Sequence, residues 1–242
     1  MSVERRQIEF TPAAEPNVAL GVFDTMLVVD GIPLEAPRHL ARLATSLHEL
    51  YGQSLPVSLN ERLMSAADGH ELARLRVDVA PGDLEGAIRI EPFERALVLA
   101  EQDRELATVN VAGGFGAHKL VDRAWLDQIE AAAGEGVRAL MVAPSGALLE
   151  TTRANVFLLR GGVIATPPLD GSILPGVTRA VLLERAGRAE ISSHELPLTL
   201  ADLGNAEAVL LTSSLRLLEC ARVRDGRRSA DVLARLRAAL AP

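Results

Sequence analysis

Residues 149–179 read LETTRANVFLLRGGVIATPPLDGSILPGVTR, and this stretch decides how the rest of the chain is interpreted. Residues 155–159 predict a strand, Gly161-Gly162 predicts a tight turn, and 163–166 predict a second strand. Pro175-Gly176 then precedes a segment, Val177 to Arg185, that we expect to be helical. The stretch therefore predicts two strands joined by a glycine turn and followed by a helix.

Strand and helix patterns continue on both sides of this stretch. Leu20 to Val29 is apolar and β-prone, and Asp30-Gly31 after it is typical of a hairpin turn with a short return strand. Leucines at three- and four-residue spacing predict a helix from Ala36 that ends at Gly52. Further strands are expected at 75–79, 88–91, 95–100, 107–111, 137–143, 147–150, 208–211 and 217–223. Further helices are expected from Ser58, with Glu61 completing a capping box, at 122–133, closed by Gly134, and at 229–240.

The segment Glu101 to Glu105 is rich in charged and amide side chains and stands between apolar segments, as a linker does. We therefore expect an α+β protein of two subdomains. The smaller one would span 1–102 and the larger one 103–242.

Composition narrows the class of protein. The chain has 242 residues, of which 48% are apolar, so it can bury a substantial core. The absence of an apolar run of about 18 residues argues against a membrane span, the charged start argues against a signal peptide, and the expected location is the cytoplasm. A net charge of −7 with scattered basic residues argues against a nucleic-acid partner. The single cysteine, Cys220, and five histidines without ligand spacing give no support for a disulfide framework or a metal site.

The use of basic residues is uneven. Of the 25, 24 are arginine, and Lys119 is the single lysine. A coding bias toward arginine explains the 24 positions but not the exception. An amine can lose its proton and form a Schiff base, whereas a guanidinium stays protonated. Lys119 is therefore a candidate for covalent chemistry, with chance retention as the alternative.

A glycine-rich turn, Gly113 to Gly116, precedes Lys119 and invites two nucleotide-binding interpretations. A phosphate-binding loop fails because His118 and Leu120 stand where glycine and a hydroxyl residue are needed. A dinucleotide loop fails because Lys119 occupies the position of its third glycine.

The segments around Lys119 resemble the fold-type IV pyridoxal-phosphate enzymes. Leu149 to Phe157 is similar to the family pattern E-x-x-x-x-N-[LIV]-F, and Thr166 to Arg179 to its continuation T-P-P…L-P-G-[IV]-T-R. Gly21 to Thr25 resembles the first strand of the family, G-V-F-E-T, and His39 to Leu43 resembles its helix H-L-x-R-L. The resemblance covers nearly the whole chain. It implies a two-subdomain fold like that of D-amino-acid aminotransferase, with pyridoxal 5'-phosphate in the cleft between the subdomains.

The resemblance also implies roles for particular residues. Lys119 would be the Schiff-base lysine, and Glu150 the carboxylate that faces the pyridine nitrogen and keeps it protonated. Val177 and Thr178, at a helix N-terminus, would hold the phosphate together with Arg42. The alternatives are an exposed charge at a strand end for Glu150 and an ordinary surface arginine for Arg42.

Five further positions carry weaker expectations. Ser213 and Ser214, in an expected polar turn at 212–214, correspond to a second phosphate-contacting loop, although such turns are also common for local hydrogen bonding. Arg123 stands where relatives carry an arginine or a tyrosine near the phenolic oxygen of the cofactor, and a salt-bridged arginine of a first helical turn is the alternative. Arg74 and Arg76 share a strand face and could bind a substrate carboxylate, or form a solvated face.

The family includes branched-chain and D-amino-acid aminotransferases and aminodeoxychorismate lyase. Phe23-Asp24-Thr25 is nearer the lyase and D-amino-acid branch, Tyr51 is the single tyrosine, and the N-terminal strand pair is shortened. We therefore expect a homodimeric lyase that converts 4-amino-4-deoxychorismate to p-aminobenzoate and pyruvate. A class IV aminotransferase of branched-chain or D-amino acids is the alternative. A catalytically silent binder on the same scaffold is a third possibility, against which the retained lysine argues.

Overall fold

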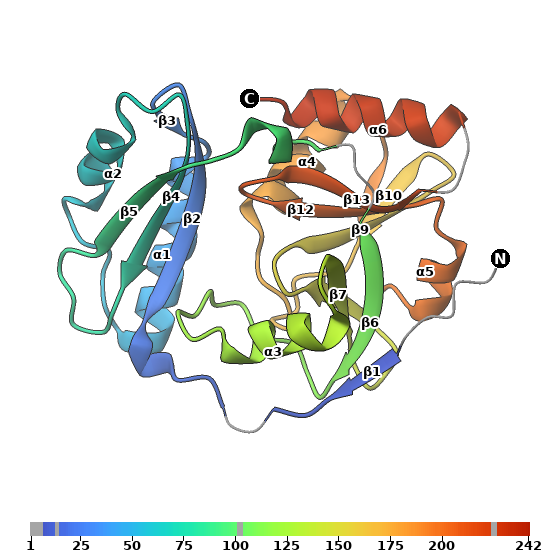
Figure 1. Ribbon diagram of the computed structural model, residues 1–242, viewed down its shortest axis with the longest axis horizontal. Helices are drawn as coiled ribbons and strands as arrows, with labels where there is room; N and C mark the ends of the chain where they lie inside the picture. The colour runs from blue at the N-terminus through green and yellow to red at the C-terminus, as the bar shows by residue number, and fades with distance from the viewer. Residues whose placement is uncertain (1–6, 13–14, 101–103, 224–226) are drawn as a thin grey trace. The chain divides into compact units, whose positions relative to one another are not determined.

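The computed structural model describes residues 7–12, 15–100, 104–223 and 227–242 (Figure 1). Their contacts define two compact units. The small unit comprises 15–98 and 117–123 with Pro242, and the large unit comprises 99–116, 124–241 and the described residues before 15. The expected division at 102/103 treats each subdomain as continuous, whereas these contacts assign the N-terminal segment to the large unit and 117–123 to the small one. Residues 101–103 of the expected linker lie outside the described residues.

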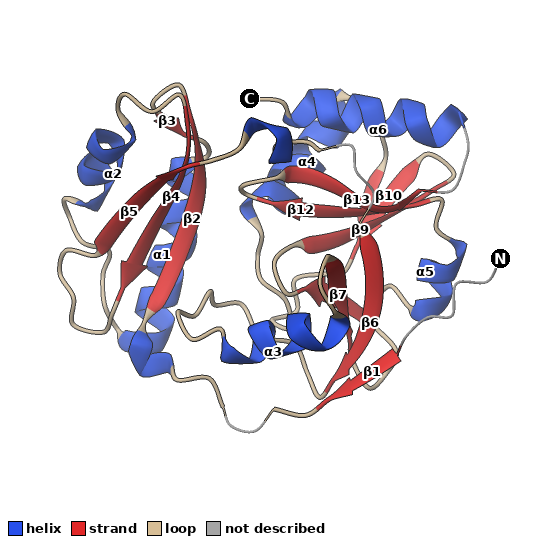
Figure 2. Ribbon diagram, in the orientation of Figure 1, coloured by secondary structure: helices blue, strands red, loops and turns tan. Residues whose placement is uncertain are grey.

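The small unit is an antiparallel sheet with the order β3-β2-β4-β5 and two helices (Figure 2). Its strands are β2 (Val22–Val29), β3 (Ile32–Pro33), β4 (Leu72–Val79) and β5 (Ala87–Pro92). Its helices are α1 (Ala36–Tyr51) and α2 (Leu59–Ala67), with short 3-10 turns η1 (Val18–Leu20) and η2 (Arg95–Leu97). Asp30 and Gly31 both have positive φ, as a two-residue turn between β2 and β3 requires, so the predicted hairpin is confirmed.

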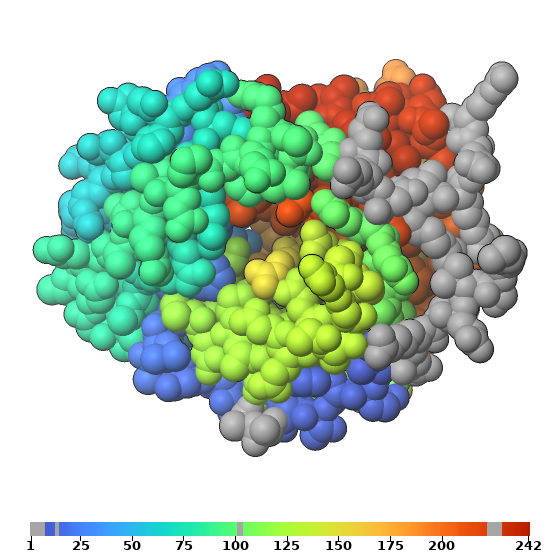
Figure 3. Space-filling model, in the orientation of Figure 1, coloured from blue at the N-terminus to red at the C-terminus, as the bar shows by residue number. Residues whose placement is uncertain are grey.

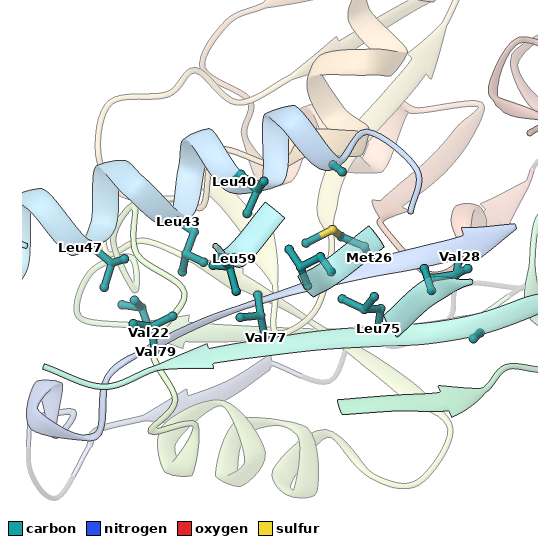
Figure 4. Close-up of a cluster of buried hydrophobic side chains, with 14 residues drawn as sticks. Val22, Met26, Val28, Leu40, Leu43, Leu47, Leu59, Leu75, Val77 and Val79 are labelled. Carbon is teal, nitrogen blue, oxygen red and sulfur yellow. The ribbon is translucent and has the colours of Figure 1, made fainter. Parts of the chain in front are cut away.

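One hydrophobic cluster holds the small unit together (Figure 4). Leu40, Leu43 and Leu47 lie on one face of α1, as their spacing predicted, and pack on the apolar side chains of β2 and β4. Alternate residues of β4 are buried, which confirms the predicted period of two. Replacing Leu43, which is 1% exposed, with alanine is expected to cost about 2–5 kcal/mol of unfolding free energy.

The described part of the large unit contains a branched sheet of nine strands. The main path is β1-β6-β7-β8-β9-β10-β11, and β12 joins at β9 and carries β13. The strands are β1 (Gln7–Phe10), β6 (Glu105–Val111), β7 (Val137–Val142), β8 (Leu148–Thr151), β9 (Asn155–Arg160), β10 (Val163–Thr166), β11 (Ser193–Glu195), β12 (Ala208–Ser213) and β13 (Leu217–Val223). The helices are α3 (Ala124–Ala133), α4 (Val177–Arg188), α5 (Leu200–Asn205) and α6 (Arg227–Leu240).

Both faces of this sheet are covered. Ile129 of α3 packs with Val109 and Met141 on one face, and the outer side of α3 lies at the surface, in yellow-green in Figure 3. Leu203 of α5 packs with Leu140 on the other face. Helix α4 packs against α6 and β12. Because both faces are covered by apolar contacts, polar side chains can gather at the ends of the strands and at the start of α4.

Several sequence expectations were wrong in detail. Residues 95–100 form no strand, because η2 occupies 95–97 and Leu99 has positive φ. Ser58 does precede α2, but its side chain makes no capping hydrogen bond, so no capping box forms with Glu61. The polar turn begins at Ser214, because 212 and 213 still belong to β12. Strands β1 and β11 and helix α5 were not predicted.

Candidate active site

The backbone of Lys119 is held at the edge of the small-unit sheet. The Phe23 N–H donates to the Lys119 carbonyl at 2.9 Å, and the Val121 N–H donates to the Gly21 carbonyl at 2.9 Å. Gly21 is required there because a Cβ on it would lie 2.3 Å from the Val79 carbonyl oxygen. Strand β2 therefore fixes the position of Lys119 beside the Phe23–Asp24 dipeptide.

Three cationic side chains surround the ring of Phe23. The Lys119 Nζ lies 4.9 Å from the ring centroid, and the guanidinium carbons of Arg76 and Arg123 lie 3.8 Å and 5.8 Å from it. Cations over an aromatic face are attracted by its quadrupole, which offsets part of their mutual repulsion. The structure thus brings Lys119, Arg76 and Arg123 together on one platform.

This environment changes the acidity of Lys119. Burial lowers the pKa of its amine to about 7, and the positive charges of Arg42, Arg123 and Arg76 act in the same direction. The carboxylate of Asp24 opposes them. Near neutral pH about half of the amine is therefore unprotonated, which is the form that acts as a nucleophile or a base.

Arg42 and Asp24 form a buried fork. The Arg42 Nε donates to Asp24 Oδ2 at 3.0 Å and its Nη2 to Oδ1 at 2.8 Å, and His39 Nδ1 lies 2.8 Å from the same Oδ1. Although burial alone would raise it, Arg42 and His39 hold the pKa of Asp24 well below its usual range. Burial lowers the pKa of His39, so a neutral ring donates to the carboxylate. Arg42 is 9% exposed, which contradicts the alternative of a surface arginine.

Arg74 and Arg76 lie on the same face of β4, as predicted, but in different surroundings. Arg76 donates to Asp78 through Nε and is 18% exposed, whereas Arg74 is 36% exposed and lies 3.4 Å from the exposed carboxylate of Glu91. Arg76 stacks on Phe23 in addition. Of the pair, only Arg76 belongs to the surroundings of Lys119.

In the large unit, Glu150 is a buried acceptor. Its Oε2 accepts from Asn155 Nδ2 and its Oε1 from the Leu174 N–H, each at 2.9 Å. Asn155 Nδ2 also donates to the Leu174 carbonyl at 2.9 Å. Glu150 is 7% exposed, which contradicts the alternative of an exposed charge at a strand end. The orientation of the carboxylate is therefore fixed by Asn155 and Leu174, which both lie in the stretch 149–179.

Helix α4 begins beside Asn155. Gly176 is its N-cap residue and has no side chain with which to cap the first amides, and Val177 and Thr178 follow it and are buried. A Cβ on Gly176 would lie 1.8 Å from Asn155 Oδ1, so only glycine permits this approach. A helix N-terminus of this kind favours an anion.

Strand pairing places a further polar residue in line with Glu150 and Asn155, and we call this line of polar residues across three strands the polar row. Glu150 of β8 pairs with Asn155 of β9, which pairs with Thr212 of β12. Ser213 follows, half-buried, with its hydroxyl accepting from the Arg216 N–H at 3.4 Å, and Ser214 starts the turn. Asp24 was not predicted as a site residue, and Thr212 was expected only as part of the polar turn at 212–214, in which Ser213 and Ser214 were the assigned residues. The departure of Asp24 from the family pattern and the run Thr212-Ser213-Ser214 were the available signals.

The predicted site residues thus fall into two groups. Those of the small unit are Arg42, Arg74, Arg76, Lys119 and Arg123. Those of the large unit are Glu150, Val177, Thr178, Ser213 and Ser214. Within the first group the structure gathers all but Arg74, and within the second it joins Glu150 to the start of α4 through Asn155.

In the part of the chain that the structure describes, no cluster of histidine, cysteine and carboxylate side chains could hold a metal ion. In the same residues, no helix has both the length and the apolar character that crossing a membrane needs.

The fold is shared with a known class of enzyme. The PLP-bound form of a hypothetical aminotransferase from Mycobacterium tuberculosis aligns with a TM-score of 0.73 and 24% identity over 96% of this chain and 95% of that chain. The predicted α+β architecture is therefore confirmed as that of a fold-type IV enzyme, a mixed α/β fold built on two sheets.

Sequence comparison gives the family. Residues 21–224 match the family described as Amino-transferase class IV. The chain belongs to this family of pyridoxal-phosphate-dependent enzymes, as its motifs predicted.

The curated relatives differ in activity. Aminodeoxychorismate lyase of Bacillus subtilis is 26% identical over 192 residues, which are 69% of this chain and 64% of that protein. Branched-chain-amino-acid aminotransferase 6 of Arabidopsis thaliana is 37% identical over 65 residues, or 27% of this chain and 18% of that protein. The chain thus spans less than two thirds of the length of either relative.

Proposed function

We propose that the protein binds pyridoxal 5'-phosphate and acts, as a homodimer, as a lyase on 4-amino-4-deoxychorismate. The products would be p-aminobenzoate and pyruvate. The observation that carries the substrate class is the cationic platform of Lys119, Arg76 and Arg123 on Phe23.

The residues present fit this cofactor. An aldehyde needs an amine that is neutral near pH 7, and the pKa of Lys119 is lowered to about 7. A pyridine nitrogen needs a fixed carboxylate, and Glu150 is buried with both oxygens held. A phosphate needs unpaired donors, and α4 begins at Gly176 without a side-chain cap.

The bound cofactor would supply an aldehyde for the amino group of the substrate and a protonated ring that takes up electrons as bonds break. Glu150 would hold the proton on the ring nitrogen, because the Asn155 and Leu174 donors stabilise its charged form. Lys119 would move a proton at the substrate, since both of its protonation states are populated near pH 7. Arg42 would hold the phosphate, in an orientation set by its fork with Asp24.

The charges around Lys119 favour a substrate with two carboxylates. Arg76 and Arg123 provide guanidinium groups beside the amine, and 4-amino-4-deoxychorismate carries a carboxylate on its ring and another on its enolpyruvyl group. A branched-chain amino acid needs an apolar pocket for its side chain, and the platform offers one phenyl ring shared by cations.

The alternative, transfer of the amino group to a keto acid, uses the same Lys119 and Glu150. The match of residues 21–224 to a family named for aminotransferases supports it. The two functions differ in whether the substrate loses pyruvate or exchanges its amino group.

Product analysis separates them. The purified protein, supplied with pyridoxal phosphate, is incubated with 4-amino-4-deoxychorismate or with a panel of amino donors and keto acceptors, and pyruvate, p-aminobenzoate and new amino acids are followed. Lys119→Arg is the matched control, because it keeps the charge and cannot form a Schiff base. Pyruvate and p-aminobenzoate in equal amounts support the lyase, and new amino acids support the alternative.

Cofactor binding without turnover of any substrate would support the silent binder. Borohydride reduction tests the cofactor assignment separately, because label must appear on Lys119, the single lysine. Label confined to the N-terminal amine would refute it. A solution mass equal to that of one chain would refute the homodimer.

A further inference from the structure

The cationic platform of the small unit surrounds an amine that solvent molecules can reach. The Lys119 Nζ lies 4.9 Å from the centroid of the Phe23 ring, and Lys119 is half-buried rather than sealed from solvent. The guanidinium carbons of Arg76 and Arg123 lie 3.8 Å and 5.8 Å from the same centroid. All four residues belong to the small unit, whereas the polar row belongs to the large unit. Two guanidinium groups therefore lie beside one accessible amine.

The donors of Arg76 are only partly used. Its Nε donates to Asp78 at 2.9 Å and its Nη2 donates to the same carboxylate, and among the described residues none accepts from its Nη1. Asp78 also accepts from Arg89, so Arg76, Asp78 and Arg89 together carry one net positive charge. A guanidinium group with an N–H to spare can bind a further carboxylate through a charge-assisted hydrogen bond.

The negative charge closest to this platform is already matched. The carboxylate of Asp24 raises the pKa of the amine, but it lies in the fork of Arg42, which donates to it at 3.0 Å and 2.8 Å. The neutral ring of His39 donates to the same carboxylate. What remains is the positive charge of Arg76 and Arg123, both of which lower the pKa of the amine. These surroundings disfavour an ammonium ion and favour an anion in its place.

Addition of CO2 to an amine makes that change of charge. The pKa of Lys119 is lowered to about 7, so a large part of the amine is neutral near neutral pH, whereas an ordinary lysine is protonated there. The neutral nitrogen attacks the carbon of CO2 and a C–N bond forms. One C–O π bond opens to give a carboxylate, and the proton lost by the nitrogen goes to solvent. The product, a carbamate, has one negative charge and two oxygens that can accept from guanidinium groups.

We propose that Lys119 of the cofactor-free protein is a carbamylation site, which adds CO2 reversibly to give a carbamate held by Arg76 and Arg123. The same cations favour both parts of the reaction, because they disfavour the protonated amine and attract the anion that it becomes. CO2 and the aldehyde of the cofactor need the same nitrogen, so CO2 should compete with cofactor loading. This competition, but not the carbamate itself, rests on the proposed function.

Carbon NMR tests the proposal on the full chain. The apoprotein is equilibrated with isotopically labelled bicarbonate and CO2, and the carbamate carbon is quantified as CO2 is raised. Measurement at several pH values allows the affinity to be expressed per neutral amine. The signal should saturate with CO2 in the parent. In Lys119→Arg only the contribution of the N-terminal amine should remain, because the chain has a single lysine.

Two arginine variants separate the platform from the general charge of its strand. Arg76→Met removes a donor of the carbamate and should lower the affinity of the neutral amine for CO2 by about tenfold or more. Arg74→Met is the matched control, since Arg74 lies on the same face of β4 but beside the exposed carboxylate of Glu91. It removes an equal charge and should leave the affinity within about twofold, because solvent screens a charge at the surface.

Four results decide the matter. A carbamate signal that is unchanged in Lys119→Arg would overturn the proposal, because it would come from the N-terminal amine. Equal losses of affinity in the two arginine variants would overturn the role of the platform. If Lys119 forms a carbamate but borohydride traps no pyridoxal phosphate on it, the proposed function fails and the carbamate stands. If borohydride traps the cofactor on Lys119 in a protein that forms no carbamate there, the proposed function stands and this inference fails.

Discussion

Raising the pH through 7 should make the single lysine reactive. With its pKa lowered to about 7, a large fraction of the Lys119 amine is neutral at pH 7.5, against about one part in a thousand for an ordinary lysine. The neutral fraction rises with pH, so the rate of acylation should follow a curve with its midpoint near 7. An ordinary lysine would give a midpoint above 10.

Competitive labelling measures this curve without any substrate. The apoprotein is treated with a trace of an acylating reagent between pH 5 and 11, and the peptide that contains Lys119 is quantified by mass spectrometry. Because the chain has one lysine, the N-terminal amine is the single competing amine and serves as an internal reference.

Two variants test the cause of the lowered pKa of Lys119, because they are expected to move this pKa in opposite directions. Asp24→Asn removes the negative charge that raises the pKa of Lys119, so the midpoint should move below 7. Arg76→Met removes a positive charge that lowers it, so the midpoint should move upward, and Asp78 keeps its partner Arg89 in this variant. A midpoint near 10 in the parent, or shifts of the same sign in both variants, would refute the reasoning.

Three further substitutions test the assignments. Glu150→Gln should retain the cofactor but lose about 2–4 kcal/mol of transition-state stabilisation, two to three decades in kcat, and unchanged turnover would remove Glu150 from the mechanism. Arg42→Lys keeps the charge opposite Asp24 but loses the two-pronged hydrogen bonding of the guanidinium. Titration should show that the affinity for pyridoxal phosphate falls about ten- to a hundred-fold. An affinity equal to that of the parent would exclude a phosphate contact. Gly176→Ala should weaken phosphate binding, because its Cβ would meet Asn155. The control Gly187→Ala lies in the same helix with open space around it, so it should leave phosphate binding unchanged and add about 0.5–1 kcal/mol to the unfolding free energy. Equal phosphate affinities of the two variants would contradict the close approach at Gly176.

Much of the fold follows from local patterns. The leucine spacing of α1 and the alternation of β4 each record one buried face, and these elements were predicted because the burial is local. Helix α5 was missed although Thr199 and Asp202 form a capping box at its start. Its six residues are too few for a periodic apolar pattern. Strand β1 pairs in parallel with β6, about a hundred residues along the chain, and no local pattern reports such a pairing.

Site residues could be predicted from the sequence where their residue type or spacing is itself distinctive. A lone lysine and the Glu-to-Asn-Val-Phe spacing single out Lys119 and Glu150 directly. The fork between Arg42 and Asp24 was not predictable, because it depends on α1 packing across β2.

The way Lys119 is attached to its sheet affects the order in which the protein forms. Its segment pairs with β2 through Val22 and Leu120, so closing this contact joins residues about 100 positions apart. The rest of the small-unit sheet needs only residues up to Pro92. During synthesis this sheet can therefore form first, with its edge beside Phe23 unpaired, and the reactive amine is added last. The strand pairings of the small-unit sheet can therefore be complete in a nascent chain that does not yet contain its nucleophile.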